Sequence, residues 1–122
     1  KEAVEGCNFL EMQRIPNCCE HSHYTFTVKY TGEELTGLTW KDFYNCYVEM
    51  GGDGFYGACK VPYLEPAFKG LSVNGITYSK GICPVAEEIQ PQIMQFKTNY
   101  RDLEIAKEQA HLLKLLIEKL SK

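Results

Sequence analysis

The densest group of chemically active side chains in this chain is Cys18-Cys19-Glu20-His21-Ser22-His23. Thiolate sulfur and imidazole nitrogen are ligands that zinc prefers in proteins. Two neighbouring cysteines point in opposite directions in an extended chain, however, and no second pair of ligands follows at a spacing familiar from zinc sites. We therefore expect no metal site, and interpret the segment as the entrance to a strand whose histidines face solvent or another domain.

Other reactive side chains lack the neighbours that catalysis needs. Cys59 and Cys83 have no adjacent histidine to activate a nucleophile, and His111 stands alone among leucines. Glu87 and Glu88 are consecutive and would face roughly 100° apart on a helix, which does not make an acid–base pair. We interpret all five as structural or surface residues and expect no catalytic residue in this chain.

A glycine-rich segment and a set of aromatic residues could bind ligands. Gly51-Gly52-Asp53-Gly54 could hold a phosphate, because glycines let backbone amides approach an anion. The segment lacks the spacing of a Walker loop or a dinucleotide fingerprint, so the end of a helix is the better interpretation. Aromatic side chains could stack on a sugar or base, although those at helical spacing are more often part of a core. They are Tyr44, Tyr47, Phe55, Tyr56 and Tyr63.

The first half of the chain predicts a connector, a strand and a helix. Residues 1–23 show no clear period, so we interpret them as a connector that enters the domain. Side chains alternate from Tyr24 to Tyr30, which predicts a half-buried strand. Thr39 and Asp42 have the spacing of a capping box and an aromatic face follows, which together predict a helix over residues 39–50.

The middle of the chain predicts a long loop followed by a short helix. Glycine, proline and tyrosine interrupt residues 51–80 without a helical period, and loops this long are usually functional or covered by a partner. Asn74-Gly75 predicts a hairpin between residues 71–73 and 76–78. Pro84 suits the first turn of a helix that ends near Gln90, because Pro91 cannot continue its hydrogen bonds.

The end of the chain predicts a strand and a long helix. Apolar and polar side chains alternate over residues 94–98, and Asp102 can cap the helix that follows. The predicted apolar face of this helix consists of Leu103, Ala106, Ala110, Leu113, Ile117 and Leu120. The order of elements predicts an α+β fold, a small sheet covered by helices, in one domain over residues 24–122.

Composition excludes some classes of function. The chain of 122 residues has 13 basic and 16 acidic side chains and a net charge of -3, so it lacks the basic footprint of a nucleic-acid binder. No run approaches the ~20 apolar residues of a membrane span. Six cysteines could form three disulfides in a secreted domain, but a chain this long can fold on apolar burial, which favours a reduced, cytoplasmic protein. Because Lys1 follows no initiator methionine, we expect an excised fragment.

Several motifs in the second half of the chain, together with their order, resemble a known family. They are Val61-Pro62-Tyr63-Leu64-Glu65-Pro66-Ala67-Phe68, Gly81, Cys83-Pro84-Val85-Ala86-Glu87-Glu88, Met94-Gln95-Phe96-Lys97-Thr98-Asn99 and the helix from Asp102 to Leu120. From roughly Trp40 to Leu120 the chain resembles the C-terminus of DegT/DnrJ/EryC1/StrS sugar aminotransferases, which use pyridoxal phosphate (PLP). The resemblance implies the C-terminal small domain of an aspartate-aminotransferase-like, fold type I enzyme.

The resemblance also implies a function for the parent protein. Such enzymes transfer an amino group, typically from glutamate, to a keto-sugar carried on a nucleotide, and a homodimer is expected. No lysine here has the setting of the family's cofactor lysine, so the fragment should bind no PLP and be inactive without the missing large domain. Its role would be to pack on that domain and to wall the substrate cleft. By correspondence with the family's substrate-facing segment, Tyr56, Lys60 and Tyr63 are the candidate substrate-binding residues, with Arg14 a weaker phosphate candidate.

Two other classes of function remain open at this point. The chain could be a small secreted module stapled by disulfides, with the aromatic loop as its ligand surface. It could also be a non-catalytic interaction domain whose apolar surface is covered by a partner chain.

Overall fold

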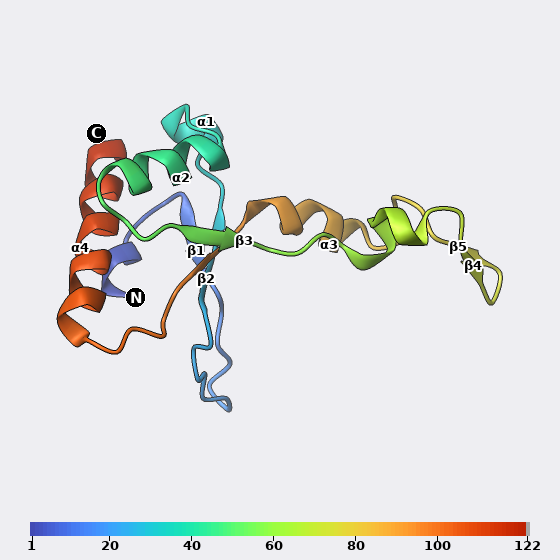
Figure 1. Cartoon of the computed structure of the whole chain (residues 1–122), viewed down its shortest axis with the longest axis horizontal. Coiled ribbons are helices and arrows are strands. Elements are labelled where there is room, and N and C mark those ends of the chain that lie inside the picture. The colour runs from blue at the N-terminus through green and yellow to red at the C-terminus, as the bar shows by residue number, and fades with distance from the viewer. Residues whose placement is uncertain (122) are drawn as a thin grey trace.

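The protein consists of a globular part and a long arm, as Figure 1 shows. A computed structural model describes residues 1–121. The helices are α1 (Glu33–Thr36), α2 (Trp40–Glu49), α3 (Pro84–Ile89) and α4 (Leu103–Leu120). The strands are β1 (Leu10–Met12), β2 (Phe26–Tyr30), β3 (Phe55–Gly57), β4 (Ser72–Val73), β5 (Ile76–Thr77) and β6 (Ile93–Phe96), and short 3-10 turns occupy Glu2–Val4, Pro62–Leu64, Pro66–Phe68 and Gln90–Gln92.

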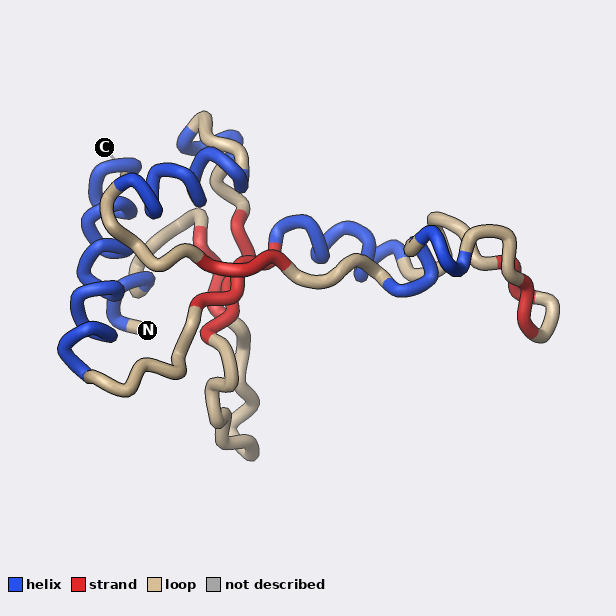
Figure 2. The backbone as a smooth tube through the Cα atoms, in the orientation of Figure 1, coloured by secondary structure: helices blue, strands red, loops and turns tan. Residues whose placement is uncertain are grey.

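The globular part is built on a four-stranded antiparallel sheet with the order β1-β2-β6-β3. Figure 2 shows these strands meeting at the centre, with α2 and α4 around them. Val28 on β2 pairs with Met94 on β6, and both side chains are buried. The α+β class predicted from the sequence is therefore confirmed, as are the strands predicted near residues 24–30 and 94–98.

One core joins the sheet to the helices. Phe43 and Tyr47 of α2 and Leu116 of α4 pack with the strands, and the aromatic face predicted for α2 supplies several of the contacts. The buried core residues are Val4, Phe9, Leu10, Val28, Tyr30, Phe43, Tyr47, Phe55, Met94, Phe96, Leu113, Leu116 and Ile117. Burial of these large apolar side chains is the main source of stability for a domain of this size.

Helix α2 begins and ends as its sequence predicts. The Thr39 hydroxyl accepts a hydrogen bond from the Asp42 amide at 3.2 Å, and the Thr39 amide donates to the Asp42 carboxylate at 3.1 Å. Gly51 follows the helix with a φ of 96°, a conformation that favours glycine. A Cβ at Gly52 would lie 2.5 Å from the Tyr47 ring, so that position also needs glycine. Helix termination therefore explains the glycine-rich segment.

Helix α4 has a shorter buried face than predicted. The Asp102 carboxylate caps it by accepting from the Glu104 amide at 2.8 Å. Leu113, Leu116 and Ile117 are buried, whereas Leu103 is 68% exposed. The prediction that Leu103 belongs to the core face is wrong, because only the second half of this helix, which is about 27 Å long, lies against the core.

The N-terminal residues belong to the domain rather than only leading into it. Val4 and Phe9 are buried in the core, and Leu10 of β1 pairs with Tyr30 of β2. Interpreting residues 1–23 as a connector therefore does not describe their first half. A three-residue edge strand offers too short an alternation for its pattern to be recognised. Residues 13–25 then form a loop that leaves the sheet before β2, seen below the globular part in Figure 1.

The arm comprises residues 58–92 and leaves the sheet after β3 and returns at β6. The predicted hairpin forms its tip, where Ser72 pairs with Thr77 and both Asn74 and Gly75 have positive φ. Helix α3 begins at Pro84 as predicted and lies on the returning segment. The strand β3, which carries Phe55, was not predicted within the long loop.

No helix within residues 1–121 has the length and apolarity needed to cross a membrane.

Candidate functional site

The two segments of the arm are joined by a partly buried contact between Tyr63 and Glu87. The Tyr63 hydroxyl donates to the Glu87 carboxylate at 2.5 Å and accepts from the Cys83 amide at 2.9 Å. The Gly81 amide donates to the same carboxylate, at 2.7 and 3.0 Å to its two oxygens. Glu87, interpreted from the sequence as an ordinary first-turn charge, is thus the acceptor that holds the outgoing and returning segments together.

Charge and solvation fix the protonation states of this pair. The hydrogen bond from Tyr63 lowers the pKa of Glu87, and the amides of Gly81 and Cys83 lower it further against partial removal from solvent. Partial removal from solvent, together with the Glu87 carboxylate, raises the pKa of Tyr63 to about 12. At neutral pH Tyr63 is therefore a neutral donor and Glu87 an ionised acceptor, the charge-assisted form of the bond.

Further contacts order the arm along its length. The Gln90 side chain donates to the Ala58 carbonyl at 3.0 Å near the root, and the Tyr78 amide donates to the Leu71 carbonyl at 2.9 Å near the tip. The Phe68 and Tyr78 rings pack edge to face at 6.0 Å. The arm is therefore held by a small number of polar bonds and one aromatic pair.

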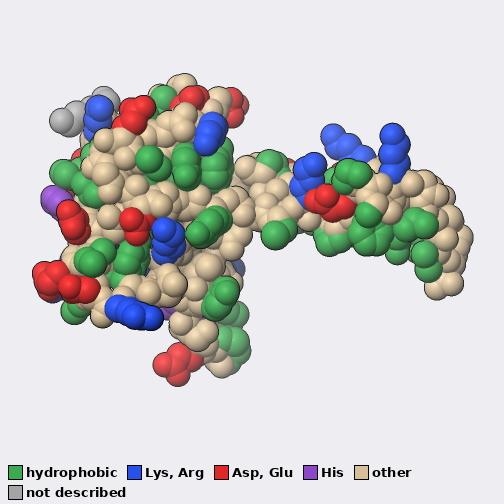
Figure 3. Space-filling view, viewed as in Figure 1, with side chains coloured by type: hydrophobic (Ala, Val, Ile, Leu, Met, Phe, Trp, Pro, Cys, Tyr) green, Lys and Arg blue, Asp and Glu red, His purple; other side chains and the backbone are tan. Residues whose placement is uncertain are grey.

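The arm exposes most of its apolar side chains. Val61 is the one buried residue among residues 58–92. The large apolar residues that remain exposed there are Leu64, Phe68, Leu71, Val73, Ile76, Ile82 and Val85. Figure 3 shows hydrophobic side chains gathered along one edge of the arm and lysines along the opposite edge. A surface of this kind, outside the core, is typical of a segment that binds another surface.

Of the three candidate substrate residues, Tyr56 lies on the sheet just before the arm, and Lys60 and Tyr63 lie on the outgoing segment of the arm. Tyr56 lies on β3 opposite Gln95 and is exposed, Lys60 is exposed on the outgoing segment, and Tyr63 is half-buried. Within residues 1–121 no hydrogen bond or ring contact joins the three. Because the Tyr63 hydroxyl is already bonded to Glu87 and Cys83, its first role in this structure is to order the arm.

Tyr56 borders a hollow of mixed polar and apolar lining beside β3 and β6. The hollow has a volume of about 710 Å³ and is also lined by Tyr24, Asp53, Lys97 and Tyr100. The Lys97 ammonium lies 3.8 Å from the Asp53 carboxylate. Burial and the nearby Asp53 raise the pKa of Tyr100 to about 12, so its hydroxyl stays protonated at neutral pH. The hollow offers donors, acceptors and aromatic rings, the groups that contact sugar rings and hydroxyls.

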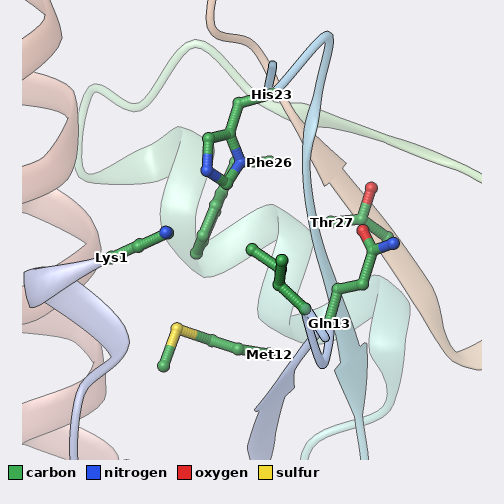
Figure 4. Close-up of a pocket in the computed structure, with 7 residues that line it drawn as sticks. Lys1, Met12, Gln13, His23, Phe26 and Thr27 are labelled. Carbon is green, nitrogen blue, oxygen red and sulfur yellow. The ribbon is translucent and has the colours of Figure 1, made fainter. Parts of the chain in front are cut away.

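A smaller pocket of about 180 Å³ lies beside β1 and β2. Figure 4 shows Lys1 extending toward Phe26, with His23 beside that ring and Met12 on the opposite side. Partial desolvation and the proximity of His21 and Lys1 lower the pKa of His23. The residues lining the pocket include no carboxylate that could orient the His23 ring.

The residues that the structure describes do not fit PLP. That cofactor requires a lysine facing a closed site, a carboxylate for its ring nitrogen and a cup for its phosphate. Within residues 1–121 no charged or polar side chain is buried, and the lysines with ionic partners pair with Glu11, Asp53 and Glu104 near the surface. The described part of the chain also contains no group of three or more side chains able to hold a metal ion.

The cysteines are arranged differently from the sequence expectation at one place. Cys18 and Cys19 do not point apart, because their Sγ atoms are 3.8 Å from each other. The cause is a turn in which the Cys19 amide donates to the Pro16 carbonyl at 3.0 Å, so the chain is not extended there. All six cysteines are free thiols in the described structure; Cys7 and Cys46 are partly buried, and the other four are exposed.

Comparisons with known proteins add no relative. No family model matches the chain, no curated protein matches it, and no solved structure matches it.

Proposed function

We propose that this chain is the C-terminal small domain of a PLP-dependent aminotransferase that moves an amino group, typically from glutamate, to a nucleotide-linked keto-sugar. In this proposal the cofactor and its lysine belong to a large domain that is not part of these 122 residues. The chain packs on that domain and walls the substrate cleft in a cytoplasmic homodimer, and it has no transaminase activity alone.

The observation that carries the proposal is the joining of two segments of the resemblance on the arm. Tyr63, from the proline-tyrosine segment, and Glu87, from the cysteine-proline segment, share one hydrogen bond although they lie 24 residues apart. Two sequence motifs that resemble one family thus form a single structural unit. That unit extends from the core and leaves its apolar side chains uncovered, as expected of a segment that lies against a larger domain.

The candidate substrate residues have chemistry that suits a nucleotide sugar. Tyr56 has an exposed hydroxyl that can donate to or accept from sugar hydroxyls, beside a hollow that also contains Asp53 and Lys97. Lys60 is an exposed ammonium that can act as a point charge for a diphosphate. Tyr63 orders the arm, on which Lys60 lies, through its bonds to Glu87 and Cys83. When bound to the parent enzyme, PLP would supply the electron sink for amino transfer.

The test is to express the whole coding sequence from which this chain derives. We expect the purified parent to be yellow from bound PLP, to lose the colour on borohydride treatment, and to aminate a nucleotide-linked keto-sugar with glutamate. The 122-residue chain alone is expected to stay colourless when PLP is added. A parent that binds no PLP would contradict the family, and a yellow parent that rejects every nucleotide-linked ketone would contradict the substrate class.

A second function is favoured by the same exposed surface. A non-catalytic interaction domain would also extend an apolar arm toward a partner chain. Substitution of Lys60 by Ala in the parent separates the two functions. The aminotransferase proposal expects a higher KM for the nucleotide sugar with bound PLP unchanged, whereas an interaction domain has no substrate whose KM could change.

A further inference from the structure

A pair of neighbouring thiols lies on the loop between β1 and β2, away from the arm. Cys18 and Cys19 are both exposed, and their Sγ atoms are 3.8 Å apart. Residues 17 and 18 form the turn that brings the side chains to the same side, and the Cys19 amide closes it on the Pro16 carbonyl. The other exposed thiols, Cys59 and Cys83, are free and have no second sulfur as a partner among the described residues.

We propose that Cys18 and Cys19 form a redox-sensitive vicinal dithiol that a peroxide oxidises to an intrachain disulfide. This inference does not depend on the proposed aminotransferase function. The site is a modification site on an exposed loop, and its co-reactants are a peroxide for oxidation and a small dithiol or thiol for reduction.

The reaction balances in two steps. One thiolate attacks a peroxide oxygen, the O–O bond breaks, and the sulfur becomes a sulfenic acid while hydroxide leaves and is protonated to water. The second thiolate then attacks the sulfenic sulfur, the S–S bond forms, and the sulfenic oxygen leaves as water. Two thiols and one hydrogen peroxide thus give one disulfide and two waters, with the peroxide as the two-electron oxidant.

The geometry favours closure and also predicts that it is reversible. The thiols already lie in sulfur contact, so the second step requires little rearrangement of the loop. Neighbouring Cα atoms are about 3.8 Å apart, shorter than the roughly 4.4–6.8 Å of ordinary disulfides, so the closed ring is strained. Strained and exposed disulfides are the easily reduced ones, which suits a switch rather than a structural crosslink.

The positions of the trypsin sites allow the oxidation of Cys18 and Cys19 to be measured on a single peptide. Trypsin cleaves after Arg14 and Lys29, and the peptide between them, residues 15–29, contains two cysteines and no other cleavage site. We treat the folded 122-residue chain with equimolar hydrogen peroxide, label the remaining thiols and analyse the digest by mass spectrometry. We expect peptide 15–29 to lose two hydrogen atoms and carry no label. After reduction with dithiothreitol, both of its cysteines should again take up the label.

Controls distinguish oxidation that depends on the folded Cys18–Cys19 pair from the general reactivity of exposed thiols. Cys18→Ser should abolish the loss of two hydrogens in peptide 15–29, whereas Cys59→Ser should leave it unchanged. In urea, where the turn is lost, closure should be at least ~10-fold slower, because the folded loop holds the sulfurs together. Equal rates in folded and unfolded chain, sulfinic acid as the main product, or disulfides from Cys18 to more distant cysteines would each overturn the proposal.

Discussion

Tyr63 and Glu87 show how one side-chain contact can organise a long excursion of the chain. They lie 24 residues apart in the sequence. The Tyr63 hydroxyl and the Gly81 amide donate to the Glu87 carboxylate, and the Cys83 amide donates to the Tyr63 hydroxyl. The sequence does not indicate that these two residues form a pair, because a tyrosine in a loop and a glutamate in the first turn of a helix are both common. Their pairing depends on how the arm folds back, which local patterns do not encode.

Replacing Tyr63 by Phe tests this contact. The substitution keeps the ring and removes the hydroxyl that donates to Glu87 and accepts from Cys83. We expect faster hydrogen exchange at the amides of Gly81 and Cys83 and little change in the sheet, since the arm lies outside the core. The matched control is Tyr56→Phe, whose exposed hydroxyl has no hydrogen bond in the described structure. Equal exchange in the two variants would contradict the role of Tyr63.

The pH dependence of the arm follows from the same pair. Glu87 has a pKa lowered from 4.5, so its stabilising contribution is present above that value and is lost as pH falls through the depressed pKa. Tyr63 has a pKa raised from 10.0 to about 12, so its contribution is present below 10.0 and is lost as pH rises toward 12. NMR titration of the Gly81 amide should therefore show a plateau between these limits. A Glu87 carboxyl that titrates above 4.5 would contradict the expectation.

At the scale of elements, local signals identified most helices and strands but not their burial. The Thr39 capping box, Pro84 at a helix start and the Asn74-Gly75 turn are short-range chemistry, and each gave the expected element. The strands β1 and β3 have three residues each and no readable alternation. For α4 the apolar pattern predicts the helix itself. Which of its apolar residues are buried depends on how far the sheet extends along the helix.

The buried face of α4 can be tested by two leucine substitutions on the same helix. Leu116 is 1% exposed, so Leu116→Ala should lower the free energy of unfolding by roughly 2–5 kcal/mol through lost burial and a cavity. Leu103 is 68% exposed, so Leu103→Ala should change it by less than about 0.5 kcal/mol. Urea denaturation followed by circular dichroism measures both. A larger cost at Leu103 would mean that its helix turn is covered in solution.

The whole molecule is a small core from which an apolar arm extends, and only part of this could be predicted. The α+β class follows from the order of periodic segments, and a long functional loop was expected between residues 51 and 80. That the loop would project as an ordered arm, with Tyr56 left on the sheet, could not be predicted. Such placement depends on long-range pairing, as does the burial of Val4 beside α4 and of Phe9 against Phe43.

Thiol chemistry tests the organisation of the whole chain. All six cysteines are free in the described structure, so titration in denaturant should count about six thiols, whereas a disulfide-stapled secreted module would give none. In the folded chain Cys18, Cys19, Cys59 and Cys83 should react quickly. The partly buried Cys7 and Cys46, which pack against the core, should react more slowly.

Residues Gly57 and Met94, at the two ends of the excursion, are paired neighbours on adjacent antiparallel strands. Because the chain leaves the sheet and returns to it at positions that pair with each other, the pairing of β3 with β6 does not depend on the length of the segment between them. Residues 58–92 are therefore an insertion whose two ends meet at one paired position of the sheet, so a change in its length need not shift the register of β3 on β6. The length of the arm and the strand pairing beneath it can in this architecture change independently.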